Sequence, residues 1–135
     1  MTTEIDEKKK QEIVFRFQMF EQQMQNLQQQ LQAVEQGVVE LNSLNLGLDE
    51  LVGGKDKEIM APIGRGIFAK AKLLSEDLVV DIGNKNLVKK SIPDTKKILE
   101  EQIEKLGEVR KELVSEAEKI QGEMAKIFEE VQREA

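Results

Sequence analysis

Two glycine motifs have the residue types and spacing closest to those of nucleotide-binding chemistry. Ile63-Gly64-Arg65-Gly66-Ile67-Phe68-Ala69 contains the spacing GxGxxA after an apolar segment, as in a dinucleotide fingerprint. That fingerprint needs a helix directly after the glycines, because the helix N-terminus holds the pyrophosphate. Residues 67–74 instead alternate like a strand, so this motif predicts a hairpin turn with glycines at positive φ.

The second motif, Gly53-Gly54-Lys55, resembles the end of a phosphate-binding loop. Asp49 stands where the first loop glycine would be, and Asp56 stands where the loop needs Ser or Thr for Mg²⁺. The pattern therefore predicts a helix end followed by a turn, and we expect no cofactor.

The residue types that other chemistries require are missing. The 135 residues include no His and no Cys, which excludes the common zinc sites and Ser-His or Cys-His nucleophilic catalysis. The many carboxylates show no pairing typical of an acid-base site. We expect a protein that is not an enzyme and holds no metal.

Charge and hydropathy argue against nucleic-acid binding, membrane insertion and secretion. The formal net charge is −6 and the pI about 4.9, which argues against nucleic-acid binding. No apolar run approaches the roughly 18 residues of a membrane helix, and no apolar stretch follows the charged first residues as in a secretory signal. These features predict a cytoplasmic protein with no membrane partner.

The N-terminal third, residues 5–50, has the heptad pattern of a coiled-coil helix. Steps of four and three residues alternate along an apolar seam over about four heptads. The seam consists of Ile13, Phe17, Phe20, Met24, Leu27, Leu31, Val34, Val38 and Leu41, and returns at Leu48.

The C-terminal third, residues 91–135, has a second seam. Ser91 is a helix cap, Pro93 suits the first turn, and Asp94 has the spacing of a capping box. Lys96 and Arg110 occupy seam positions, where a polar residue can fix register. The apolar members are Ile92, Leu99, Ile103, Leu106, Leu113, Ala117, Ile120, Met124, Ile127 and Val131.

Two helices of similar length, joined by a short insert, predict an antiparallel coiled-coil hairpin within one chain. Each helix would be about 65 Å long. The predicted register places Ile13 opposite Ile127, Leu27 opposite Leu113, and Leu48 opposite Ile92, to within about one helical turn. A parallel pairing of two copies is the alternative that a heptad seam also allows.

The middle, residues 52–90, predicts two tandem β-hairpins. Alternating segments at residues 58–63, 67–74, 78–82 and 86–90 are separated by glycine or polar turns. The predicted fold is therefore mainly α with a small β part, in a single domain spanning residues 1–135.

Such short hairpins leave strand edges and apolar side chains open. Small sheets are marginal alone, so we expect the strands to be shared with other subunits in an oligomeric sheet or β-barrel platform. The alternative is a cap folded back on the base of the coiled coil. The apolar residues concerned are Ile63, Ile67, Phe68, Val79, Val80, Ile82, Leu87 and Val88.

Apolar residues outside the seam gather near both chain termini. Val14, Phe15 and Met19 lie outside the seam in the first turns of the N-terminal helix. Phe128 lies beside the second seam. Antiparallel pairing brings these ends together, so we expect an exposed apolar patch of the kind that binds other molecules. Packing with a fraying helix end or a neighbouring chain is the alternative.

The whole chain resembles the prefoldin family, in particular its α-class subunits. The resemblance is strongest in the hairpin segment Ala61-Pro62-Ile63-Gly64-Arg65-Gly66-Ile67-Phe68-Ala69-Lys70-Ala71. It is also present at Val80-Asp81-Ile82-Gly83 and at Lys89-Lys90-Ser91 before the last helix. The turn Gly83-Asn84-Lys85-Asn86 departs from the usual α-class pattern, which puts the choice of partner subunit in doubt.

This resemblance implies an ATP-independent chaperone subunit, a holdase. In such a family, two α-class and four β-class subunits share their hairpins, and the coiled-coil tips hold unfolded or nascent proteins for a group II chaperonin. The resemblance assigns client contact to Val14, Phe15, Met19, Ile127, Phe128 and Val131. Two alternatives stay open: a γ-type prefoldin that self-assembles into filaments, and a coiled-coil scaffold with one specific partner.

Overall fold

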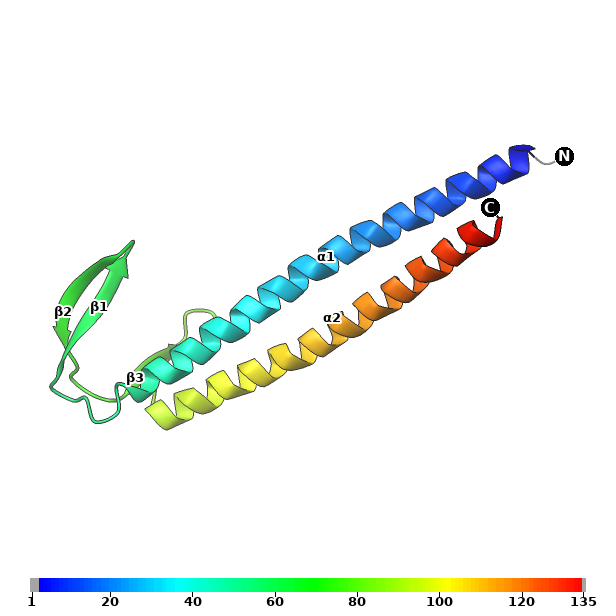
Figure 1. The fold of residues 1–135 in the computed structure, drawn as a ribbon. Helices are drawn as coiled ribbons and strands as arrows, with labels where there is room; N and C mark the ends of the chain where they lie inside the picture. The colour runs from blue at the N-terminus through cyan, green and yellow to red at the C-terminus, as the bar shows by residue number, and fades with distance from the viewer. Residues whose placement is uncertain (1–2, 135) are drawn as a thin grey trace. The chain divides into compact units, whose positions relative to one another are not determined.

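The structure, a computed structural model, describes residues 3–134, with side chains for residues 7–133. Two long helices flank two β-hairpins, in the predicted order (Figure 1). The elements are α1 (Thr3–Asp49), β1 (Glu58–Gly64), β2 (Ile67–Lys72), β3 (Leu78–Asp81), β4 (Leu87–Lys90) and α2 (Ile92–Glu134). The fold class and the antiparallel self-pairing of the helices are confirmed, and the strand ends differ from the prediction by one or two residues.

The chain forms two compact units. The terminal unit combines α1 up to Gly37 with α2 from Leu106, and the hairpin unit consists of Val38–Lys105. In the terminal unit the seam is the least exposed stripe of each helix, as the alternation of four and three residues requires. Its most buried members are Leu27, Leu113 and Ile127.

Contacts between the helices agree with the predicted register to about one turn. In the terminal unit Arg110 Nε lies 3.5 Å from Glu35 Oε1, and a Cβ on Gly37 would lie 3.3 Å from Leu106. In the hairpin unit Lys96 pairs with Asp49. In each pair the contacting residues lie slightly further toward the C-terminus of their helices than the predicted register places them. This offset is expected, because side chains tilt toward the N-terminus of their own helix.

Two predicted seam residues are exposed, whereas the others are buried or half-buried. Arg110 is about half exposed and reaches out of the seam to Glu35, so the pair adds little stability as a surface ion pair. Val131 is 45% exposed. It lies at the open groove that Ile13, Val14 and Phe128 also line, so only part of its side chain is covered.

The hairpin unit has a small apolar core at the ends of the helices. Leu48, Ile92 and Leu99 are buried together, with Leu41, Leu51 and Leu78 packed against them. The predicted cap at Ser91 is confirmed: its Oγ accepts a hydrogen bond from the N–H of Asp94 at 3.2 Å. Leu78 is the first residue of β3, so this core fastens the second hairpin to the helices.

The first hairpin pairs β1 with β2 around a two-residue turn. Gly64 is paired with Ile67, and both turn residues have positive φ, 50° at Arg65 and 79° at Gly66. A turn of this kind matches the right-handed twist of the strands, and glycine adopts it without strain. Because β2 follows the glycines where a dinucleotide site needs a helix, the hairpin-turn interpretation is correct.

The second hairpin pairs β3 with β4, from Leu78 opposite Lys90 to Asp81 opposite Leu87. Its turn has positive φ at Gly83, Asn84 and Lys85, and the Gly83 N–H donates to Asp81 Oδ1 at 2.8 Å. The two hairpins are separate two-stranded sheets, and residues 3–134 form no closed barrel by themselves.

The glycines of the terminal unit give a stability prediction. A Cβ on Gly107 would meet no atom within 4 Å, so Gly107→Ala should raise the free energy of unfolding by about 0.5–1 kcal/mol. Gly37→Ala should gain less, because its Cβ presses on Leu106. Urea unfolding followed by circular dichroism, at one protein concentration, measures both. Equal gains at the two positions would contradict the close approach of the helices at Gly37.

Candidate functional site

An apolar surface, here called the terminal patch, lies on the terminal unit outside the seam. Phe15 is 62% exposed and Phe128 is 60% exposed, values far above those of the seam residues. Val14 and Met19 of α1 and Val131 of α2 are also exposed. The predicted apolar exposure near the chain ends is thus present, and it consists of Val14, Phe15, Met19, Phe128 and Val131.

The terminal patch includes a groove between the two helices. Val14 and Phe128 are its exposed walls, and the half-buried Ile13 and Phe17 lie deeper. Gln18, Glu21, Ile127 and Val131 complete the lining. Phe15 lies beside this groove in a second shallow hollow that shares Val14 and Gln18. The surface can therefore receive apolar side chains at two adjoining places.

Ile127 differs from the other residues that were expected to contact a client. It is only 1% exposed, the most buried side chain among the described residues. The reason is its seam position, which directs it between the helices, whereas Phe128 one residue later points beside the seam. Ile127 forms the floor beneath the terminal patch and is not part of its exposed surface.

The opposite flank of the same helix pair is charged. Lys9 and Arg16 of α1 lie with Glu130 and Arg133 of α2 around a polar hollow. These residues occupy heptad positions on the other side of the seam from Val14 and Phe128. The flank with Val14 and Phe128 is therefore apolar and the other flank is polar, and only the apolar flank suits binding driven by desolvation. Met19 is exposed one heptad after Glu12 of the polar hollow, so it lies outside the apolar groove.

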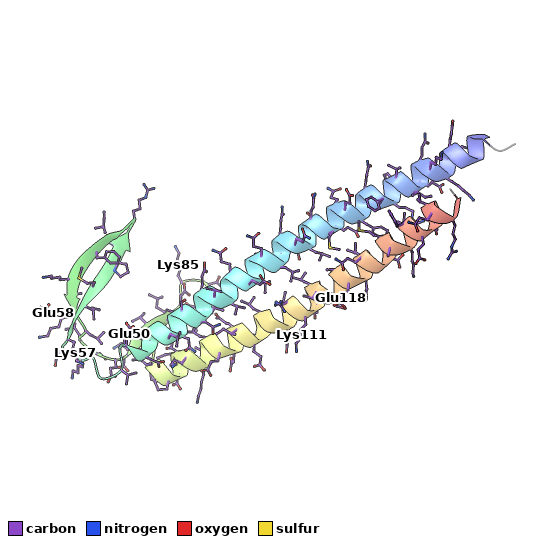
Figure 2. All side chains as sticks on the ribbon, viewed as in Figure 1. Glu50, Lys57, Glu58, Lys85, Lys111 and Glu118 are labelled. Carbon is purple, nitrogen blue, oxygen red and sulfur yellow. The ribbon has the colours of Figure 1, made fainter. Side chains whose placement is uncertain are left out.

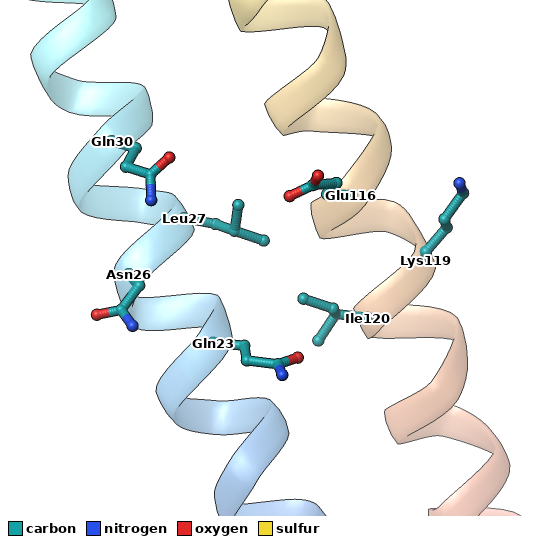
Figure 3. Close-up of a pocket in the computed structure, with 7 residues that line it drawn as sticks. All are labelled: Gln23, Asn26, Leu27, Gln30, Glu116, Lys119 and Ile120. Carbon is teal, nitrogen blue, oxygen red and sulfur yellow. The ribbon is translucent and has the colours of Figure 1, made fainter.

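A further hollow lies midway along the terminal unit, where Leu27 and Ile120 face each other between the helices (Figure 3). Its rim is polar and consists of Gln23, Asn26, Gln30, Glu116 and Lys119. The apolar atoms here belong to the seam itself. We regard it as a solvated flank of the coiled coil, which the heptad pattern did not predict.

The hairpins carry the second set of exposed apolar residues. Ile63, Ile67, Phe68, Val79, Ile82 and Leu87 are all more than half exposed. Val80 and Val88 are paired and are largely covered, because their face of the second hairpin also carries Leu78, which packs on the helix core. The alternative of a cap folded back on the coiled coil therefore holds for one face of the second hairpin. The Phe68 face of the first hairpin is uncovered.

Sequence reasoning missed several exposed apolar residues. Met60 lies on the Phe68 face of the first hairpin, and strand alternation from Phe68 and Pro62 would have identified it. Val39 and Leu46 are one heptad apart on the outer face of α1 in the hairpin unit, and Leu74 lies between the hairpins. Scattered singly, such residues are ordinary surface.

Side chains over residues 7–133 are distributed along both helices and both hairpins (Figure 2). Among these residues, no three carboxylates gather in a way that could hold a metal ion. None of the described helices is long and apolar enough to cross a membrane.

Comparison with known proteins gives a consistent result. Residues 20–135 match the sequence model of the prefoldin subunit family. A prefoldin subunit alpha of Methanococcus aeolicus is 30% identical over 122 residues, covering 89% of this chain and 80% of the relative. A prefoldin subunit alpha of Methanosphaera stadtmanae is 26% identical over 95 residues, covering 70% of this chain and 69% of the relative. A cryo-EM structure of filamentous PFD from Methanocaldococcus jannaschii shares the fold, with TM-score 0.76, 18% identity, and coverage of 85% of this chain and 97% of that one.

Neighbouring residues of the terminal unit should lose very different amounts of stability on truncation. Ile127→Ala should lower the free energy of unfolding by about 2–5 kcal/mol, because it removes a fully buried side chain. Phe128→Ala should cost about 1 kcal/mol or less, because most of its ring is already in water. Urea unfolding at a fixed protein concentration measures both. A larger loss for Phe128→Ala than for Ile127→Ala would show that the assignment of floor and surface is reversed.

Proposed function

The chain belongs to the prefoldin family, and on that premise we propose that it is a subunit of an ATP-independent holdase. It binds unfolded or nascent proteins at the terminal patch, prevents their aggregation and passes them to a group II chaperonin. The observation that carries this proposal is the terminal patch: five exposed apolar residues on an otherwise charged helix pair.

The chemistry of the terminal patch suits a client without a fixed sequence. Its contacts are apolar, so their strength depends on buried area and not on matched hydrogen bonds. Met19 adds a flexible side chain that adapts to different surfaces. Each such contact is weak, and several arms on one assembly would raise the overall affinity through effective concentration.

Assembly is the second part of the proposal. The hairpins join those of other prefoldin subunits, either β-class chains or further copies of this chain. The uncovered Phe68 face and the unpaired strand edges support this role, because exposed edges favour pairing with another chain. No step of this function requires nucleotide, metal or bond-making chemistry, in keeping with the hairpin turn at Gly64–Gly66.

A second candidate is a γ-type prefoldin that self-assembles into filaments through the hairpins. The structural likeness to a filamentous PFD is the observation that favours this second candidate. Light scattering coupled to size-exclusion chromatography, over a dilution series of the chain alone, separates the two. Large species that grow with concentration support the filament, and a small defined species supports a subunit that needs a different partner.

Loss of the two exposed rings should weaken chaperone action without breaking the assembly. Phe15→Ala combined with Phe128→Ala should reduce suppression of aggregation several-fold for each of several unrelated unfolded proteins, because both changes remove apolar contact area. Turbidity of the diluted clients is the measurement, and light scattering checks that the assembly is unchanged.

The matched control is Val39→Ala combined with Leu46→Ala, which removes similarly exposed apolar area from the hairpin unit. This control should suppress aggregation like the unmodified chain. Suppression unaffected by the Phe changes would refute the terminal patch as the client site. Loss of a single tight interaction, with general suppression retained, would favour the scaffold alternative.

A charge on the uncovered face of the first hairpin should disrupt assembly. Phe68→Asp should lower the oligomer mass while leaving helicity unchanged, because Phe68 is exposed within the chain itself. Leu74→Asp, at another exposed apolar residue outside the strands, is the control and should assemble normally. Light scattering and circular dichroism measure the two properties. An oligomer of unchanged mass for Phe68→Asp would count against assembly through this face.

A further inference from the structure

The groove of the terminal patch has a carboxylate at one end. Among the described residues that line it, Glu21 alone carries a formal charge. The uncharged lining residues are Ile13, Val14, Phe17, Gln18, Ile127, Phe128 and Val131. Glu21 lies one heptad after Val14, so the two side chains are on the same flank of the helix pair. The groove is thus apolar along most of its length and negative where it ends on α1.

This carboxylate has no cation to pair with in the described part of the chain. Glu21 is exposed, and none of the ion pairs among the side chains of residues 7–133 includes it. Its neighbours three and four positions away on α1 are not basic: Phe17, Gln18, Met24 and Gln25. Across the seam, one heptad from Phe128, its counterpart in the register is the neutral Gln121.

The basic residues near the chain ends lie elsewhere. Lys9, Arg16 and Arg133 line the polar hollow on the opposite flank. Lys10 lines the second hollow, beside Phe15, and precedes Glu21 by eleven residues, about 16 Å along the helix. Since the Debye length is about 8 Å at physiological ionic strength, Lys10 does not cancel the charge at Glu21.

The position of Glu21 sets which apolar segments gain a charge interaction. Apolar walls exclude water and concentrate the field of a nearby charge. A segment that places an apolar side chain between Val14 and Phe128 gains this interaction only if it also brings a cation to Glu21. Val14 and Glu21 are seven residues apart, about 10 Å along the helix, which an extended chain spans in about three residues.

We propose that Glu21 is a specificity-determining residue of the terminal patch. It makes the groove prefer unfolded segments in which a Lys or Arg lies about three positions from an apolar residue. The apolar side chain supplies most of the binding, and Glu21 selects among apolar segments by charge. The inference rests on the proposed holdase function, to which it adds the class of client segment.

The test compares two blocked, fluorescently labelled peptides that bind the full chain, followed by fluorescence anisotropy. Each has seven residues and a central Phe flanked by Leu, with Lys or Gln three positions from the Phe. The Lys peptide should bind about two- to fivefold more tightly, the range of one exposed ion pair. Raising the salt from about 0.1 M to about 1 M shortens the Debye length from about 10 Å to about 3 Å, so it should remove the preference and retain apolar binding.

Three variants assign the preference to one carboxylate. Glu21→Gln should make the two peptides bind equally, and Glu21→Lys should make the Lys peptide the weaker ligand. Glu12→Gln is the matched control, because it removes the same charge from the polar flank and should keep the preference. Circular dichroism checks that all three variants fold, as expected for exposed positions.

The outcomes separate this inference from the proposed function. Equal binding of both peptides to the unmodified chain, a preference that survives Glu21→Gln, or no binding of either peptide would overturn the inference. Suppression of client aggregation is measured separately. If the unmodified chain suppressed it and the changes at Phe15 and Phe128 weakened that suppression, the proposed function would stand and only this inference would fall.

Discussion

The structure depends on the limited area that two paired helices can bury. Each helix presents one stripe to the other, and the alternation of four and three residues fills that stripe with apolar side chains. Any apolar residue outside it stays in water, because residues 3–134 provide no further layer to cover it. Phe128 is exposed for this reason, although Ile127 beside it is the most buried described residue. One packing constraint thus produces both the stability of the terminal unit and its exposed apolar surface.

The same constraint explains why each of the two units leaves its own apolar surface uncovered. The hairpin unit has a core of only a few residues around Leu48, Ile92 and Leu99. This core fastens the second hairpin through Leu78, and the first hairpin is left with an uncovered face. A subunit with these properties gains most of its remaining burial from other subunits. Assembly and client binding can then operate together, because the surfaces proposed for them lie on different elements of the chain.

Features with a local cause could be predicted from the sequence. The seam, the cap at Ser91 and the turn at Gly64–Gly66 follow from residue spacing and backbone preference, and the structure contains each of them. Features decided by a tertiary partner were not predicted. Val131 continues the heptad pattern but is 45% exposed at an open groove, and alternation could not tell which face of Val80 and Val88 would turn to the helices. Ile127 was assigned to the client surface through family resemblance, although its own seam position already indicated burial.

The central claim is that clients bind the exposed apolar flank of the terminal unit, and site-specific photo-crosslinking tests it most directly. A photoreactive phenylalanine analogue placed at Phe128, and in a separate chain at Val39, would be illuminated with an unfolded client and with the same client folded. The account predicts crosslinks from position 128 to the unfolded client, few to the folded one, and few from position 39. Equal crosslinking from both positions, or none from position 128, would contradict it.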